Sequence, residues 1–287
     1  MAAPETPGWG EIALPVLLAA VLVAVVVALM RRRSQAARER RLLEQPLSPE
    51  NVATLEKRFP RFRALPEELR AKLESYTNYL MNTKRFEACG GLSEVTEEMK
   101  VLISAQAALL LVGLEKHRFY PRLRSILVYP RAFRDRGRRR FGIPEEERGL
   151  LGESWETGSV ILSWDSVVAG ARNDDDGMNL VIHEFAHQLD QTDGAADGVP
   201  VLSNRDFHRR WADVFRKHYE ELVEEVNDPK SPEPFLDPYG ATHPAEFFAV
   251  VSEAFFEEPH DLEEMHPELY DQLLAFYGLD PAGWPEP

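Results

Sequence analysis

The sequence MNLVIHEFAHQLDQ, from Met178 to Gln191, is the most informative segment of the chain. Its apolar residues have the density of a buried helix, yet it places two histidines and a glutamate where leucines would pack better. On a helix, His183 and His187 lie one turn apart with their side chains pointing the same way, and Glu184 lies beside them. Three titratable groups buried within two turns are costly unless they share a ligand.

The spacing H-E-x-x-H indicates what that ligand is. Two imidazoles one turn apart can share one Zn²⁺ at about 2.0–2.1 Å. A glutamate beside them can take a proton from a water held by the metal, and the pattern is for these reasons the signature of zinc metallopeptidases. A single histidine satisfied within a core is common, but that explanation does not account for two histidines and a glutamate. We therefore expect one Zn²⁺ on His183 and His187, with Glu184 as the catalytic base.

A third protein ligand is needed, and the residues leave two candidates. Asp193 follows His187 by six residues, where metzincin-type sites carry their third ligand, although Asp190 stands where those sites have glycine. Glu246 lies in the first turn of a helix that Pro244 begins. Glu246 could instead cap that helix, but its partner would be His243, a poor N-cap residue.

Glu253 follows Glu246 by seven residues and shares its helix face. It is either an outer partner that orients a metal ligand or a surface acid at the end of the helix.

Several long segments resemble the zinc peptidases of the Mlc titration factor A family: LVIHEFAHQLD, DGVP and DPYGATHPAEFFAVVSEAFF, with ILVYPRAF and GSVILSW earlier. The resemblance covers about residues 50–280. It implies a zincin-like fold of the gluzincin type, with His183, His187 and Glu246 as metal ligands, Glu184 as base and Tyr239 facing the reacting carbonyl. It also implies an aminopeptidase-like activity on small substrates. The family it resembles is known for binding a transcriptional repressor of sugar uptake.

The N-terminus departs from that family. IALPVLLAAVLVAVVVALM, residues 12–30, holds 19 residues without a charge. As a helix it would be about 28 Å long, close to the roughly 30 Å of a hydrocarbon core. RRRSQAARERR follows it, and the positive-inside rule places these arginines in the cytoplasm. We expect residues 1–11 outside, a transmembrane helix at 12–30, a basic linker at 31–49 and a peptidase domain at 50–287, in a bacterial cytoplasmic (inner) membrane with the catalytic domain facing the cytoplasm.

The periodicity of the body predicts a mainly helical α+β domain with a small sheet. Helices are expected at about 49–58, 66–84, 94–114, 203–227, from Pro244, and 261–277, and strands at 125–130 and 158–164. Thr96 is the expected cap of the third helix, and Asp174 to Asp176 those of the H-E-x-x-H helix. The arginine-rich run at 131–140 is expected in a solvated loop.

The net charge and the cysteine content exclude two kinds of interaction. The formal net charge is -15, which argues against direct binding of nucleic acid. Cys89 is the only cysteine, so no disulfide can form within the chain. The function expected is a membrane-anchored zinc-dependent metallopeptidase that hydrolyses peptide bonds. The alternative is a membrane-tethered regulatory protein that binds a cytoplasmic transcriptional repressor, with a structural zinc that a fourth protein ligand would close.

Overall fold

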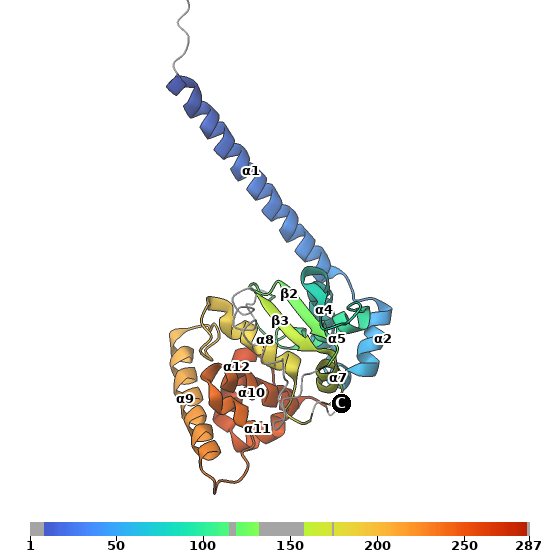
Figure 1. Cartoon of the computed structure of the whole chain (residues 1–287), viewed down its shortest axis with the longest axis vertical. Helices are drawn as coiled ribbons and strands as arrows, with labels where there is room; N and C mark the ends of the chain where they lie inside the picture. Colours follow the sequence, from blue (N-terminus) through green and yellow to red (C-terminus); the bar gives the residue numbers. More distant parts are fainter. Residues whose placement is uncertain (1–8, 115–118, 132–157, 174, 286–287) are drawn as a thin grey trace, which may run out of the picture. The chain divides into compact units, whose positions relative to one another are not determined.

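The computed structural model describes residues 9–114, 119–131, 158–173 and 175–285 (Figure 1). The chain divides into two compact units, Met1–Gln45 and Pro46–Pro287. The arginine-rich loop expected at 131–140 lies outside the described residues from position 132 onward.

Helices make up most of the described chain. In order they are α1 (Trp9–Glu44), α2 (Pro49–Arg58), α3 (Pro60–Ala64), α4 (Glu67–Thr83), α5 (Glu97–Leu109), α7 (Trp164–Arg172), α8 (Leu180–Asp190), α9 (Arg205–Asn227), α10 (Pro244–Glu257), α11 (Pro259–Met265) and α12 (Pro267–Tyr277). The 3₁₀ turns are η1 (Gln191–Asp193), η2 (Pro238–Thr242) and η3 (Pro281–Gly283). The strands are β1 (Arg85–Ala88), β2 (Ser125–Tyr129) and β3 (Ser159–Ser163).

The first unit differs from its prediction. α1 continues through residues 31–44, where a linker was expected. Arginine, glutamine, alanine, glutamate and leucine are strong helix formers, and Gln35 Nε2 donates to Glu39 Oε1 one turn on. Within the part of the chain that the structure describes, no helix combines the length and apolar character needed to cross a membrane.

The small sheet has three parallel strands in the order β1-β2-β3. Parallel neighbours require a crossover connection, and α5 lies in the connection between β1 and β2. As expected, α5 is a core helix: Thr96 accepts a hydrogen bond from the Met99 N–H at its start, and Met99 and all residues from Val101 to Leu109 are buried. The prediction of a mainly helical α+β domain with a small sheet is confirmed.

α8 lies between the sheet and the C-terminal helices (Figure 1). It packs against β3 on one side and against α10 on the other, while α10 also contacts α9, α11 and α12. A cluster of aromatic residues fills this half of the core, among them Phe247, Phe248, Phe255 and Tyr277, all almost fully buried. The helix with the H-E-x-x-H pattern is therefore fixed between the sheet and α10.

Candidate metal centre

The cap of α8 fixes the direction in which its histidines point. Asn179, not the aspartates at 174–176, is the N-cap, and its Oδ1 accepts hydrogen bonds from the N–H groups of Val181 and Ile182. An aspartate cluster has the same capping chemistry, but in the structure Asp175 and Asp176 are exposed residues before the helix. From this start, His183 and His187 follow one turn apart, with ring centroids 4.9 Å apart.

The two imidazoles converge on one carboxylate of a different helix. Nε2 of His183 lies 3.0 Å from Glu246 Oε2, and Nε2 of His187 lies 3.2 Å from the same oxygen. Glu246 is in the first turn of α10, where Pro244 takes the first helical position. His243 does cap this helix, because its Nδ1 accepts from the Ala245 N–H at 3.2 Å, so Glu246 is left to face α8.

These three side chains could hold a metal ion. One donor atom from each of His183, His187 and Glu246 lies within 4.8 Å of the others. Two imidazole nitrogens and one carboxylate oxygen are also the donor types that zinc prefers. The residues present therefore fit the group that the sequence pattern implies.

A second carboxylate orients the first imidazole. Glu253 is buried, and its Oε1 accepts from His183 Nδ1 at 2.7 Å. A metal-bound histidine commonly donates its other ring N–H to a carboxylate in this way, which fixes the tautomer and the ring orientation. The structure places Glu253 as an outer partner of the site and not as a surface acid.

The pKa directions follow from the same contacts. Burial raises the pKa of Glu246, but its hydrogen bonds with His183 and His187 outweigh burial and hold that pKa well below its ordinary value. Burial lowers the pKa of His183, and the charge of Glu253 together with bonds to both carboxylates brings it well above the ordinary value. Burial also raises the pKa of Glu184. These contacts favour the ionised form of Glu246, which is the form of a carboxylate that can bind a metal ion.

Tyr239 reaches the centre from η2. Its ring centroid lies 6.0 Å from that of His183, with the two planes 29° apart. Its backbone N–H donates to Asp237 Oδ1 at 2.8 Å, which fixes the start of the 3₁₀ turn. The structure therefore brings together the predicted residues His183, His187, Glu246 and Tyr239.

The alternative ligands lie outside this cluster. Asp193 is exposed in η1, and its Oδ1 accepts from the Ala195 N–H at 3.0 Å. Cys89, the only thiol of the chain, is half-buried just after β1 and is not a member of the cluster. Among the described residues, the set that could hold an ion consists of two histidines and one glutamate.

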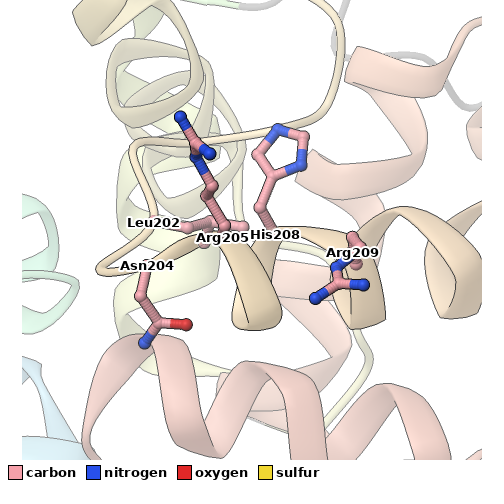
Figure 2. A pocket seen from close by; sticks show the side chains of 5 residues that line it. All are labelled: Leu202, Asn204, Arg205, His208 and Arg209. Carbon is pink, nitrogen blue, oxygen red and sulfur yellow. The ribbon is translucent and has the colours of Figure 1, made fainter.

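A separate cavity of about 600 Å³ opens at the start of α9 (Figure 2). Figure 2 shows the side chains that line it: Leu202, Asn204, Arg205, His208 and Arg209. None of these is a member of the candidate metal cluster.

Fold and cluster together define a metallopeptidase-type domain. Residues 32–278 match the family model of the glucose-regulated metallo-peptidases M90, and the chain belongs to this family. The resemblance to the Mlc titration factor A family is confirmed.

Three individual proteins that are similar to this chain show the extent of the match. An uncharacterized protein of Synechocystis sp. is 39% identical over 248 residues, which cover 85% of this chain and 89% of the relative. The Mlc titration factor A of Cronobacter sakazakii is 32% identical over 232 residues, with 77% and 83% covered. That of Pectobacterium atrosepticum is 38% identical over 170 residues, with 55% and 60% covered.

Proposed function

We propose that this protein is a zinc-dependent peptidase of the gluzincin type, with aminopeptidase-like activity on small peptides. The observation that carries the proposal is the convergence of the Nε2 atoms of His183 and His187 on one oxygen of Glu246. Three protein ligands leave a coordination position for water or substrate, whereas structural zinc sites are closed by four. The described cluster has three, which favours a catalytic site over a structural one.

The roles of the chain's residues follow from their positions. A bound zinc ion would supply Lewis acidity and an activated water. Glu184 would accept the proton of that water on its carboxylate and deliver it to the leaving amine. The Tyr239 hydroxyl would donate a hydrogen bond to the oxygen of the reacting carbonyl. Glu253 would hold the His183 ring through Nδ1.

The test separates catalysis from metal binding. Glu184→Gln keeps the shape of the side chain and removes the base, so zinc content should stay at the wild-type level while peptide hydrolysis falls by about 10²–10⁴-fold. Tyr239→Phe should also keep its zinc and lose rate. Glu220→Gln, an exposed change in α9, is the matched control. Hydrolysis at the wild-type rate by zinc-loaded Glu184→Gln would refute the mechanism.

A regulatory role is the second candidate, and the names of the relatives favour it. Proteins named Mlc titration factor A match 77% of this chain at about one-third identity. We propose that the protein also binds a cytoplasmic transcriptional repressor. Purified full-length protein would retain the repressor on a column if this holds, and Glu184→Gln would retain it equally, because binding does not require the base. Absence of retention at micromolar concentrations would exclude this partner.

We further propose that residues 12–30 anchor the protein in the cytoplasmic membrane, with residues 46–287 in the cytoplasm. The support is the uncharged sequence of 19 residues followed by an arginine-rich run. Apolar side chains on the described part of α1 face solvent, with Leu22 64% and Met30 67% exposed, and exposed apolar surface is typical of a lipid or protein contact. Extraction of the protein from membranes by alkaline carbonate would contradict the anchor, and a C-terminal reporter fusion would test its orientation.

A further inference from the structure

α10 carries three acids in one line. Glu246, Glu253 and Glu257 are spaced by seven and four residues, so they form a narrow stripe that extends about 16 Å along the helix. The stripe faces α8, because Glu257 contacts the residues just before α8 while Glu246 contacts His187 in its second half. The two helices therefore run antiparallel, and the three acids form successive rungs between them.

Each rung uses specific donors. Glu246 is the rung at the metal cluster. Glu253 is the middle rung: its Oε1 accepts from His183 Nδ1, and its Oε2 accepts from the Asn179 N–H at 2.6 Å. Glu257 is the rung farthest from the metal cluster: its Oε1 accepts from Asn179 Nδ2 at 2.9 Å. Its Oε2 accepts from the Met178 N–H, also at 2.9 Å.

Asn179 joins these rungs to the rest of the domain. While its Oδ1 caps α8, its Nδ2 also lies 3.0 Å from Gln106 Oε1 of α5 and 3.2 Å from the Gly170 carbonyl of α7. Gly170 lies so close that a Cβ there would be 2.8 Å from Asn179 Cγ. The start of α8 is therefore held from α5, α7 and α10 together.

The free-energy cost of burying these acids indicates that they do more than fill space in the core. Glu253 and Glu257 are each 4% exposed, and apolar residues of similar size commonly stabilise such a position as well or better. Both oxygens of Glu257 accept from the chain at the start of α8, so sliding α10 along α8 would break both bonds at once. A slip of one turn, about 5.4 Å, would carry Glu246 out of reach of the imidazoles.

We propose that Glu257 and Asn179 are positioning residues, which set the register of α10 on α8 and thereby place Glu246 between the two imidazoles. The inference rests on the proposed metal centre. It goes beyond that centre because Glu257 acts through Asn179 and the helix register, and not as a ligand of the metal.

The experiment measures metal affinity and folding separately on the full-length protein. The Zn²⁺ dissociation constant is obtained by competition with a chromophoric chelator, and the visible bands of the Co²⁺-loaded protein report the ligand geometry. Glu257→Gln places an amide N–H₂ against one of two N–H donors. We expect its dissociation constant to rise about 10-fold, the lower end for partners outside the ligand shell, and the Co²⁺ bands to broaden.

Two controls separate register from stability. Glu264→Gln removes an exposed acid of α11 and should bind Zn²⁺ like the wild type. Leu73→Ala opens a cavity in α4 and should lower the thermal midpoint while the dissociation constant and the Co²⁺ spectrum stay unchanged. Loss of affinity that merely follows loss of stability would appear in Leu73→Ala as well, and that result would overturn the proposal.

A second variant tests the same proposal in case Glu257→Gln does not fold. Asn179→Ser keeps an N-cap oxygen for α8 but removes the Nδ2 donor to Glu257, so it should weaken Zn²⁺ binding similarly. The proposal is wrong if both variants bind Zn²⁺ within about twofold of the wild type. The proposed function fails separately if the wild-type protein binds no Zn²⁺ or if Glu246→Ala binds it unchanged.

Discussion

Asp190, three residues after His187, is a buried acid of α8 that the mechanism does not use. Its Oδ2 accepts from the Gly198 N–H at 3.0 Å. Burial raises its pKa to about 6, against that hydrogen bond and the charge of His187, which both lower it. The folded protein therefore binds a proton at Asp190 more tightly than the unfolded chain does.

This pKa predicts how stability depends on pH. A raised carboxyl pKa contributes stability that is fully present below the unfolded value, 3.8, and is lost as the pH rises through the folded value near 6. The difference amounts to about 3 kcal/mol in the free energy of unfolding. Asp190→Asn removes this titration, so its stability relative to the wild type should rise by up to that amount between pH 4 and pH 7.

Urea unfolding of the chelator-treated proteins at several pH values measures the effect, since chelation removes the pH dependence of metal binding. Asp193→Asn changes an exposed acid of the adjacent 3₁₀ turn and serves as the matched control. A constant difference in free energy between Asp190→Asn and the wild type from pH 4 to pH 7 would contradict the prediction.

At the residue scale, local spacing predicts part of the site. His183, Glu184 and His187 are recognisable because one helical turn brings them together, while Glu246 required the resemblance to a family. Glu253 stayed undecided, because helical phase alone does not reveal which neighbour a face of α10 meets. Asn179 was missed because three aspartates before it offer the same capping chemistry. Its position just before an apolar helical run was the available signal.

At the scale of the elements, the loop between α8 and α9 contacts both helices that carry the candidate metal ligands, α8 and α10. Gly198 donates its N–H to Asp190 of α8, and its carbonyl accepts from Trp211 Nε1 of α9 at 3.1 Å. Gly198 has φ +80°, and a Cβ there would lie 2.4 Å from the Pro244 carbonyl oxygen. Only glycine therefore allows this loop to lie against the first residues of α10, two positions before Glu246.

Gly198→Ala should disturb both stability and metal binding. The left-handed conformation alone costs about 1–2 kcal/mol with a Cβ, and the clash with Pro244 adds to this by shifting the backbone that carries Glu246. Gly91→Ala is the matched control, because Gly91 has φ +86° and no atom within 4 Å of the added Cβ.

Thermal unfolding and the Zn²⁺ dissociation constant distinguish the two variants. Both should lose stability, but only Gly198→Ala should also bind Zn²⁺ more weakly. Equal Zn²⁺ affinities in the two variants would show that the loop does not position α10.

The elements that the sequence did not predict form through tertiary contacts. β1, with the sequence RFEA, is too short for a periodic signal, and it pairs in parallel with β2 from Arg85 to Ala88. α7 follows β3 directly, so one apolar stretch contains a strand and a helix. The last helix, expected as one at 261–277, is two, because Pro267 begins α12 after α11 ends at Met265.

On the scale of the whole molecule, the candidate centre depends on contacts between distant parts of one unit. Glu246 is 63 residues from His183 along the chain, and every residue of the cluster lies in the unit Pro46–Pro287. The three donors are brought together only when α8 and α10 are packed. A metal ion that binds them therefore binds the folded state, and its free energy of binding adds to stability.

Zn²⁺ should therefore raise the thermal midpoint of protein stripped with a chelator. At a free concentration of 100 times the dissociation constant, the gain is about 2.7 kcal/mol, which corresponds to about 5–11 °C for a domain of this size. Glu246→Ala removes one ligand and should lose most of that shift, whereas Asp193→Ala, which lies outside the cluster, should keep it. Calorimetry of the three proteins over a Zn²⁺ series measures the effect. If Asp193→Ala lost the shift and Glu246→Ala kept it, the third ligand would be the local aspartate, and the packing of α10 on α8 would have no part in holding the ion.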